Sequence, residues 1–214
     1  VFTLPAPFVR GNPQSFVNLF RESAIALDAT HAHAGLAVNL SPTGRAENES
    51  SEYFIAQQLG PGVDIGDPMA MKVRKLTAHL KTVDWLTLID GAMLERVGAI
   101  PALQSELPPD WFALERCAGG LLIRAGVSPL AGTAHREGQP IVAPPAYVVL
   151  NAALRAILVD SVSSLQRGTV NGDAPVYNTP ASSDAWLRRF DVSPQALLLA
   201  KAAVLETPRL LPSA

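Results

Sequence analysis

The chain has 214 residues, of which 48% are hydrophobic and 17% are charged, and its formal net charge is -2. This length and apolar content predict one globular domain over residues 1–214 rather than a disordered chain. The nearly neutral charge excludes a global field that would attract nucleic acid or an anionic membrane surface, so we expect neither as a direct partner.

The cysteine content and the apolar segments indicate a compartment. Cys117 is the single cysteine, so it cannot form an internal disulfide, and its apolar neighbours predict a buried thiol in a reducing environment. No apolar run approaches the roughly 20 residues that a membrane-spanning helix needs. We therefore expect a cytoplasmic location. Because the first residue is valine rather than methionine, we also expect sequence upstream of Val1.

In the N-terminal part, the spacing of apolar residues predicts two helices separated by a strand. A proline-opened helix is expected over 13–29, where apolar residues recur at three- and four-residue steps. Alternation of apolar residues predicts a strand over 33–40. A second helix is expected over 48–59, with three acidic residues near the positive end of its dipole, namely Glu47, Glu49 and Glu52.

The central and C-terminal parts add strands and then helices. Residues 83–89 are apolar on both faces, which predicts a central strand, and a helix over 91–98 leads away from it. Residues 112–116 and 119–125 are predicted to form a hairpin. Further helices are predicted from Pro144, from Ser183 and over 194–204. This order predicts an α+β fold with a mixed, largely antiparallel sheet packed by helices and a helical C-terminal extension over 158–214.

No group of residues in the sequence indicates a particular catalytic reaction. His31 and His33 would project to one face of a strand, where they would bind a metal only with a third ligand from elsewhere, and a role at the helix end and strand start explains them as well. The sequence contains no nucleophile motif around serine and no phosphate-binding glycine motif. We therefore predict no catalytic residue, no cofactor and no metal.

Two other function classes remain open from the residues alone. A metal-assisted hydrolase would use His31 and His33. A regulatory domain would close around a small molecule at Trp85, although the apolar neighbours of Trp85 favour a place in the core.

Charged residues are distributed unevenly along the chain. Between Asp84 and Glu115 there are six acidic residues and one basic residue, whereas the charges between Lys72 and Lys81 are all basic. An acidic surface steers a basic partner and pairs with it, although ordinary solvated charges would also give this pattern. The candidate contact residues are Glu47, Glu49, Glu52, Asp84, Asp90, Glu95, Glu106 and Asp110.

Four segments, in this order, resemble one known family. Residues 83–98 contain Val-Asp-Trp-Leu-Thr followed by a predicted helix that ends in glycine, and His33–Leu36 precedes them. Gly119–Gly126 and Pro144–Tyr147 follow. Together they resemble the type VI secretion immunity proteins, long catalogued as a domain of unknown function. The resemblance covers residues 13–157, and it departs from the family pattern at Ala99 and over 133–135.

The resemblance implies a non-enzymatic inhibitor that binds a cognate secreted toxin, the effector, and covers its active site. It also implies more sheet upstream of Val1. Many toxins associated with such proteins resemble nucleases, including DNases, whose clefts are basic because they hold phosphates. We therefore expect the acidic residues named above to imitate the charge of the nucleic-acid substrate.

Overall fold

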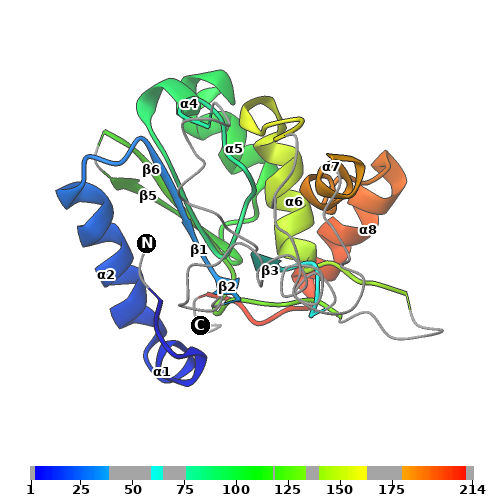
Figure 1. The fold of residues 1–214 in the computed structure, drawn as a ribbon, viewed down its shortest axis with the longest axis horizontal. Coiled ribbons are helices and arrows are strands. Elements are labelled where there is room, and N and C mark those ends of the chain that lie inside the picture. Colours follow the sequence, from blue (N-terminus) through cyan, green and yellow to red (C-terminus); the bar gives the residue numbers. More distant parts are fainter. Residues whose placement is uncertain are drawn as a thin grey trace, which may run out of the picture.

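A computed structural model describes residues 3–38, 59–64, 76–117, 119–133, 140–162 and 180–210. Its centre is a four-stranded sheet with helices on both faces (Figure 1). The predicted α+β class is therefore confirmed. The predicted helix over 48–59 lies almost entirely outside the described residues.

The main sheet is antiparallel throughout, with the strand order β1-β4-β6-β5. A separate parallel pair joins β2 to β3. The hairpin predicted from the sequence is confirmed, since β5 and β6 pair from Phe112 opposite Ala125 to Cys117 opposite Gly120. The strands are β1 (His31–Ala34), β2 (Leu36–Ala37), β3 (Val63–Asp64), β4 (Leu86–Ile89), β5 (Phe112–Cys117) and β6 (Gly120–Ala125).

The single strand predicted over 33–40 is wrong, because the chain forms two short strands in different sheets. β1 pairs with β4, β2 pairs with β3, and the chain bends at Gly35 between them. A Cβ atom at Gly35 would lie 1.7 Å from Oδ1 of Asp84, so only glycine permits this close approach. The last two residues of the predicted strand lie outside the described residues.

One face of the sheet is covered by α2 (Pro13–Ala26), and α1 (Ala6–Gly11) packs on α2; these are the blue helices of Figure 1. α2 begins at the predicted proline and ends three residues before the predicted end. The ring of Phe16 in α2 stacks on Trp85, with 5.9 Å between ring centroids. The indole of Trp85 donates a hydrogen bond to the carbonyl of Gly126 at 2.9 Å. Trp85 is therefore a core residue between α2 and the sheet.

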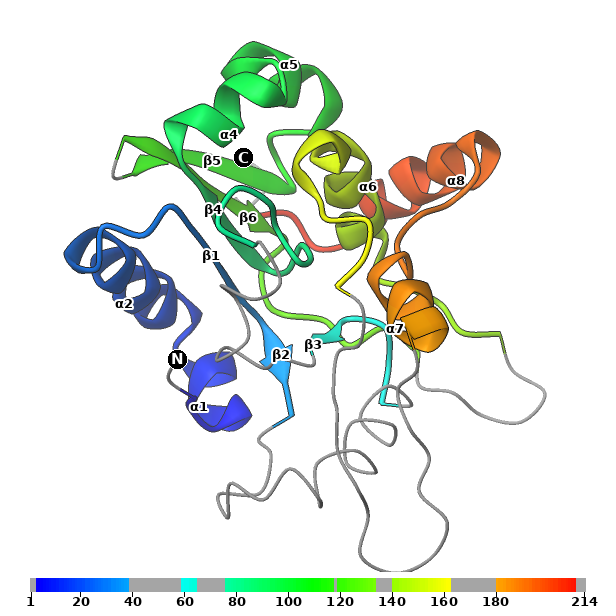
Figure 2. The same cartoon turned by 45° about the horizontal axis from the view of Figure 1, so that its top comes forward.

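The other face is covered by α4, α5 and α6, and α8 packs on α6 (Figure 2). The predicted helix over 91–98 ends early, and Gly98, with φ 86°, separates α4 from α5. Ser193 caps α8, since its hydroxyl accepts a 3.3 Å hydrogen bond from the amide of Ala196, whereas α7 begins at Pro180 rather than at Ser183. The helices are α4 (Gly91–Arg96), α5 (Ala99–Glu106), α6 (Pro145–Ala153), α7 (Pro180–Leu187) and α8 (Pro194–Leu205), with a 3-10 turn over Arg155–Ile157.

The main core runs through the sheet into the C-terminal helices. The helix predicted from Pro144 is part of this core, since Tyr147 and Leu154 are 0% exposed. Phe190 and Val204 belong to the same core cluster. Cys117 is buried, as predicted. None of the helices in the described ranges combines the length and apolar character that crossing a bilayer requires.

Gly120 gives a test of how tightly β6 packs against the end of β4. A Cβ atom at Gly120 would lie 2.0 Å from the carbonyl oxygen of Ile89, so Gly120→Ala must displace backbone. We expect the free energy of unfolding to fall by about 3 kcal/mol, measured by chemical denaturation. Gly11→Ala is the matched control, because a Cβ atom there meets nothing within 4 Å. Equal stability of the two variants would contradict this packing.

Candidate functional site

The structure places the predicted acidic contact residues in different environments. Asp84 is only 2% exposed, so the prediction that it forms part of an exposed acidic surface is wrong. Asp90 caps α4, where its carboxylate accepts a 2.8 Å hydrogen bond from the amide of Met93. Glu95 is exposed on α4. Glu47, Glu49 and Glu52 lie outside the described residues.

Two further predicted acids form ion pairs with the C-terminal part of the chain. The carboxylate of Glu106 lies 2.5 Å from Nζ of Lys201 on α8. The carboxylate of Asp110 lies 3.5 Å from the guanidinium of Arg209, whose side chain also packs over the ring of Trp111. All four charged groups are at least one-third exposed, so both pairs remain accessible to solvent. These acids are thus exposed but already have cationic neighbours.

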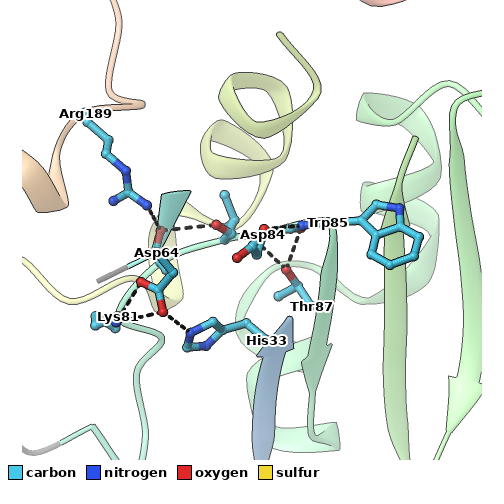
Figure 3. Close-up of polar contacts among 9 residues, drawn as sticks. His33, Asp64, Lys81, Asp84, Trp85, Thr87 and Arg189 are labelled. Atoms are coloured by element: carbon cyan, nitrogen blue, oxygen red, sulfur yellow. Dashed lines mark hydrogen bonds and ion pairs between the residues drawn. The ribbon is translucent and has the colours of Figure 1, made fainter. Parts of the chain in front are cut away.

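A buried polar cluster, formed by His33, Asp64, Lys81, Asp84 and Arg189, lies where β1, β3 and the segment before β4 meet (Figure 3). Asp64 is at its centre. Its carboxylate oxygens lie 2.8 Å from Nζ of Lys81 and 2.9 Å from Nε2 of His33. Burial alone would raise the pKa of Asp64, but the charges of Lys81 and His33 outweigh burial and hold this pKa well below its ordinary value.

The pKa of Asp84 is shifted in the opposite direction, above its ordinary value. Burial, together with the nearby charge of Asp64, raises the pKa of Asp84 to about 7, against the charges of His33 and Arg189. One carboxyl oxygen accepts a 2.7 Å hydrogen bond from the amide of Trp85. The pKa of the buried Tyr147 phenol is raised, mainly by burial and next by the charge of Asp84. Asp64 is therefore charged at neutral pH, whereas Asp84 begins to lose its proton only as the pH approaches 7.

Arg189 connects the segment between α7 and α8 to this cluster. Its guanidinium donates hydrogen bonds to the carbonyl of Pro61 at 2.6 Å and to the hydroxyl of Thr82 at 2.9 Å. The same group stacks on the ring of Trp186, 3.4 Å from the centroid. Burial lowers the pKa of Arg189 to about 10, partly offset by the charges of Asp64 and Asp84. Arg189 therefore acts as a cationic anchor for the C-terminal helices.

The residues suggested for metal or ligand binding have protein partners. The ring of His31 contacts the carbonyl of Leu76 at 2.5 Å, and that of His33 contacts Asp64. Within the described ranges, no three His, Cys, Asp or Glu side chains are placed to hold a metal ion. Trp85 is 0% exposed and stacked on Phe16, so its ring is not available to a ligand from solvent.

Sequence reasoning did not identify Asp64, Lys81 and Arg189 as members of one cluster. They come from three distant segments, and each resembles an ordinary surface charge in its local sequence. The one local feature that pointed to this cluster was the set of apolar residues around Asp84, because they imply that Asp84 is buried. The groups of this cluster are hydrogen-bonded inside the protein, so they help to hold β1, β3 and the segment before β4 together.

A family model described as TsiV, type VI immunity for VRR-NUC, matches residues 1–190. The chain belongs to the TsiV family. The fold agrees, because this TsiV chain is similar to the solved structure of the Pseudomonas aeruginosa type VI secretion system (T6SS) protein PA0821, with a TM-score of 0.86 and 32% sequence identity. The similarity covers 98% of the TsiV chain and 57% of the other chain, so the TsiV chain spans little more than half the length of that relative. No curated protein matches it.

The position of Asp84 predicts how the stability of this TsiV chain depends on pH. Because its folded pKa of about 7 lies above the ordinary 3.8, folding favours the protonated group, and this contribution is full below pH 3.8 and lost as the pH rises to 7. Asp84→Asn removes the titration and keeps an acceptor for the amide of Trp85. The stability of the variant relative to the wild type should rise over this window, by at most about 1.4 kcal/mol per pH unit.

Chemical denaturation at several pH values between 4 and 8 measures this difference. Asp28→Asn is the matched control, because it makes the same change at an exposed aspartate. The control should show no comparable trend with pH. A difference between Asp84→Asn and wild type that stays constant over the window would contradict the inferred protonation of Asp84.

Proposed function

We propose that this chain is a non-enzymatic immunity protein that binds the VRR-NUC nuclease domain of a cognate type VI effector and covers its active site. The observation that carries the proposal is the match of residues 1–190 to the family of type VI immunity proteins for VRR-NUC. The similarity to a T6SS protein of Pseudomonas aeruginosa supports the same role. The protein would thereby protect the producing cell and its sisters from the toxin.

The proposed contact surface is acidic. A nuclease cleft holds phosphate groups with basic side chains, so carboxylates on an inhibitor compete for the same positions. Asp84 is omitted because its carboxyl group is buried. The proposed contact residues are Glu47, Glu49, Glu52, Asp90, Glu95, Glu106 and Asp110.

We also propose that the chain acts in the cytoplasm as a single domain over residues 1–214, with 158–214 as its helical extension. A cytoplasmic location fits the buried free thiol of Cys117. The single domain is supported by the core, because Phe190 and Val204 pack in the same cluster as the residues of the sheet.

The direct test uses the protein encoded beside this chain. Purified chain should capture the neighbouring VRR-NUC effector, block its cleavage of DNA in solution and protect bacterial cells that express it. If the chain leaves cleavage unaffected, or if it degrades a nucleic acid itself, the proposed function is wrong.

Charge reversal tests the acidic surface. The triple variant Glu47→Lys, Glu49→Lys and Glu52→Lys should slow association with the effector at least about ten-fold at low ionic strength, because electrostatic steering is lost. The rate of association, measured by surface plasmon resonance over a range of salt concentrations, should also become less dependent on salt.

The control applies the same change in net charge elsewhere, at Glu22, Asp160 and Glu206, which are exposed and lie outside the proposed surface. If both triple variants slow association equally, net charge rather than a local surface steers the effector. An unchanged rate for the first triple variant would exclude those three residues from the interface.

A further inference from the structure

The outer edge of β5 is free of backbone partners in the described part of the chain. β5 is the last strand of the main sheet and pairs there only with β6. Its six residues contain no proline or glycine, and their pairing with β6 is unbroken. Such an edge is a template for a further strand unless something covers it.

The strand register determines which backbone groups point outward. The amide of Ala125 donates to the carbonyl of Trp85 at 2.8 Å, so the backbone of Ala125 faces β4 rather than its neighbour Phe112. Orientation alternates along antiparallel strands, so Ala113 and Glu115 face β6. The backbone N–H and C=O groups of Leu114 and Arg116 therefore point away from the sheet. No backbone hydrogen bond among the described residues uses these outward groups.

Charge distinguishes the two polar side chains of β5. Glu115 pairs with Arg21 of α2 at 3.3 Å. Arg116 is exposed, lies on the opposite face of the sheet and has no ion pair with the described residues. Opposite charges that face each other across neighbouring strands are favourable, so the edge suits a strand with an acidic residue opposite Arg116.

A second copy of this chain does not supply that acid. Two copies of β5 related by a twofold axis would pair antiparallel, and directly opposite side chains would lie on the same face of the joint sheet. Arg116 would then face Phe112, Leu114 or Arg116 of the other copy, whereas Glu115 would lie on the other face. The charge pattern therefore favours a different protein.

We propose that an extended segment of the cognate effector adds to the outer edge of β5 as a further strand, with an acidic side chain opposite Arg116. This proposal rests on the proposed function and identifies the surface that engages the effector. Backbone hydrogen bonds to Leu114 and Arg116 would orient the segment, and the charge pair would select it. Asp110 lies just before β5, so the docked effector would also approach one of the proposed acidic contacts.

Two substitutions at Arg116 separate the backbone contribution from that of the side chain. Arg116→Ala removes the charge and keeps the outward N–H, whereas Arg116→Pro removes both and leaves the hydrogen bonds to β6 intact. With the inactivated VRR-NUC domain of the effector as the probe, Arg116→Ala should raise Kd about five-fold or less. Arg116→Pro should raise it at least about ten-fold more, because a backbone acceptor of the effector loses its donor.

Hydrogen exchange of the wild-type chain tests the same edge without a substitution. In the free protein, the amides of Leu114 and Arg116 should exchange rapidly, whereas those of Ala113 and Glu115 should be protected by β6. Binding of the effector domain should protect the first pair. This measurement decides the proposal even if Arg116→Pro does not fold.

The outcomes that overturn the proposal are distinct. If the wild-type chain does not bind the effector domain, the proposed function fails and this inference fails with it. If the wild type binds but Arg116→Pro equals Arg116→Ala, or the outward amides stay unprotected, only the edge proposal is overturned. If sedimentation shows a dimer of the free chain that Arg116→Pro dissociates, a second copy occupies the edge.

Discussion

Two buried carboxyl groups, whose pKa values are shifted in opposite directions, join the main sheet to the elements around it. Asp64 is held in its charged form by Lys81 and His33, whereas burial favours the neutral form of Asp84 beside it. The charge of Asp64 is matched directly by its contacts with Lys81 and His33, whereas one oxygen of Asp84 accepts a hydrogen bond from the amide of Trp85. These contacts hold β1, β3 and the segment before β4 together inside an otherwise apolar core.

Local sequence patterns were sufficient to predict the helices and strands that are determined by neighbouring residues. Apolar spacing and capping residues predicted α2, the β5–β6 hairpin and α8. They missed α5 because Gly98 and Pro101 resemble helix breakers, yet the left-handed Gly98 ends one helix and Pro101 lies in the first turn of the next, where no N–H partner is needed. The bend at Gly35 depends on contact with Asp84, so no local pattern could show it.

The candidate site was predicted less completely than the fold. Uneven charge along the chain identified exposed acids such as Glu95, but it gave no information on burial, and Asp84 was assigned to the surface although it lies in the core. The buried cluster joins residues as far apart as His33 and Arg189, and such long-range pairing is a product of topology. Family resemblance contributed the proposed function, since no arrangement of side chains implies an immunity protein by itself.

The ion pairs of Glu106 with Lys201 and of Asp110 with Arg209 have a consequence for recognition. An incoming cation at either acid must displace a resident one, so the electrostatic gain is only the difference between two similar pairs. Discrimination between binding partners at Glu106 and Asp110 then depends on how well the partner's cationic side chain fits the site. Under the proposed function, substitution of Lys201 on α8 or of Arg209 after it would change which effector the chain binds while the carboxylates themselves stay unchanged.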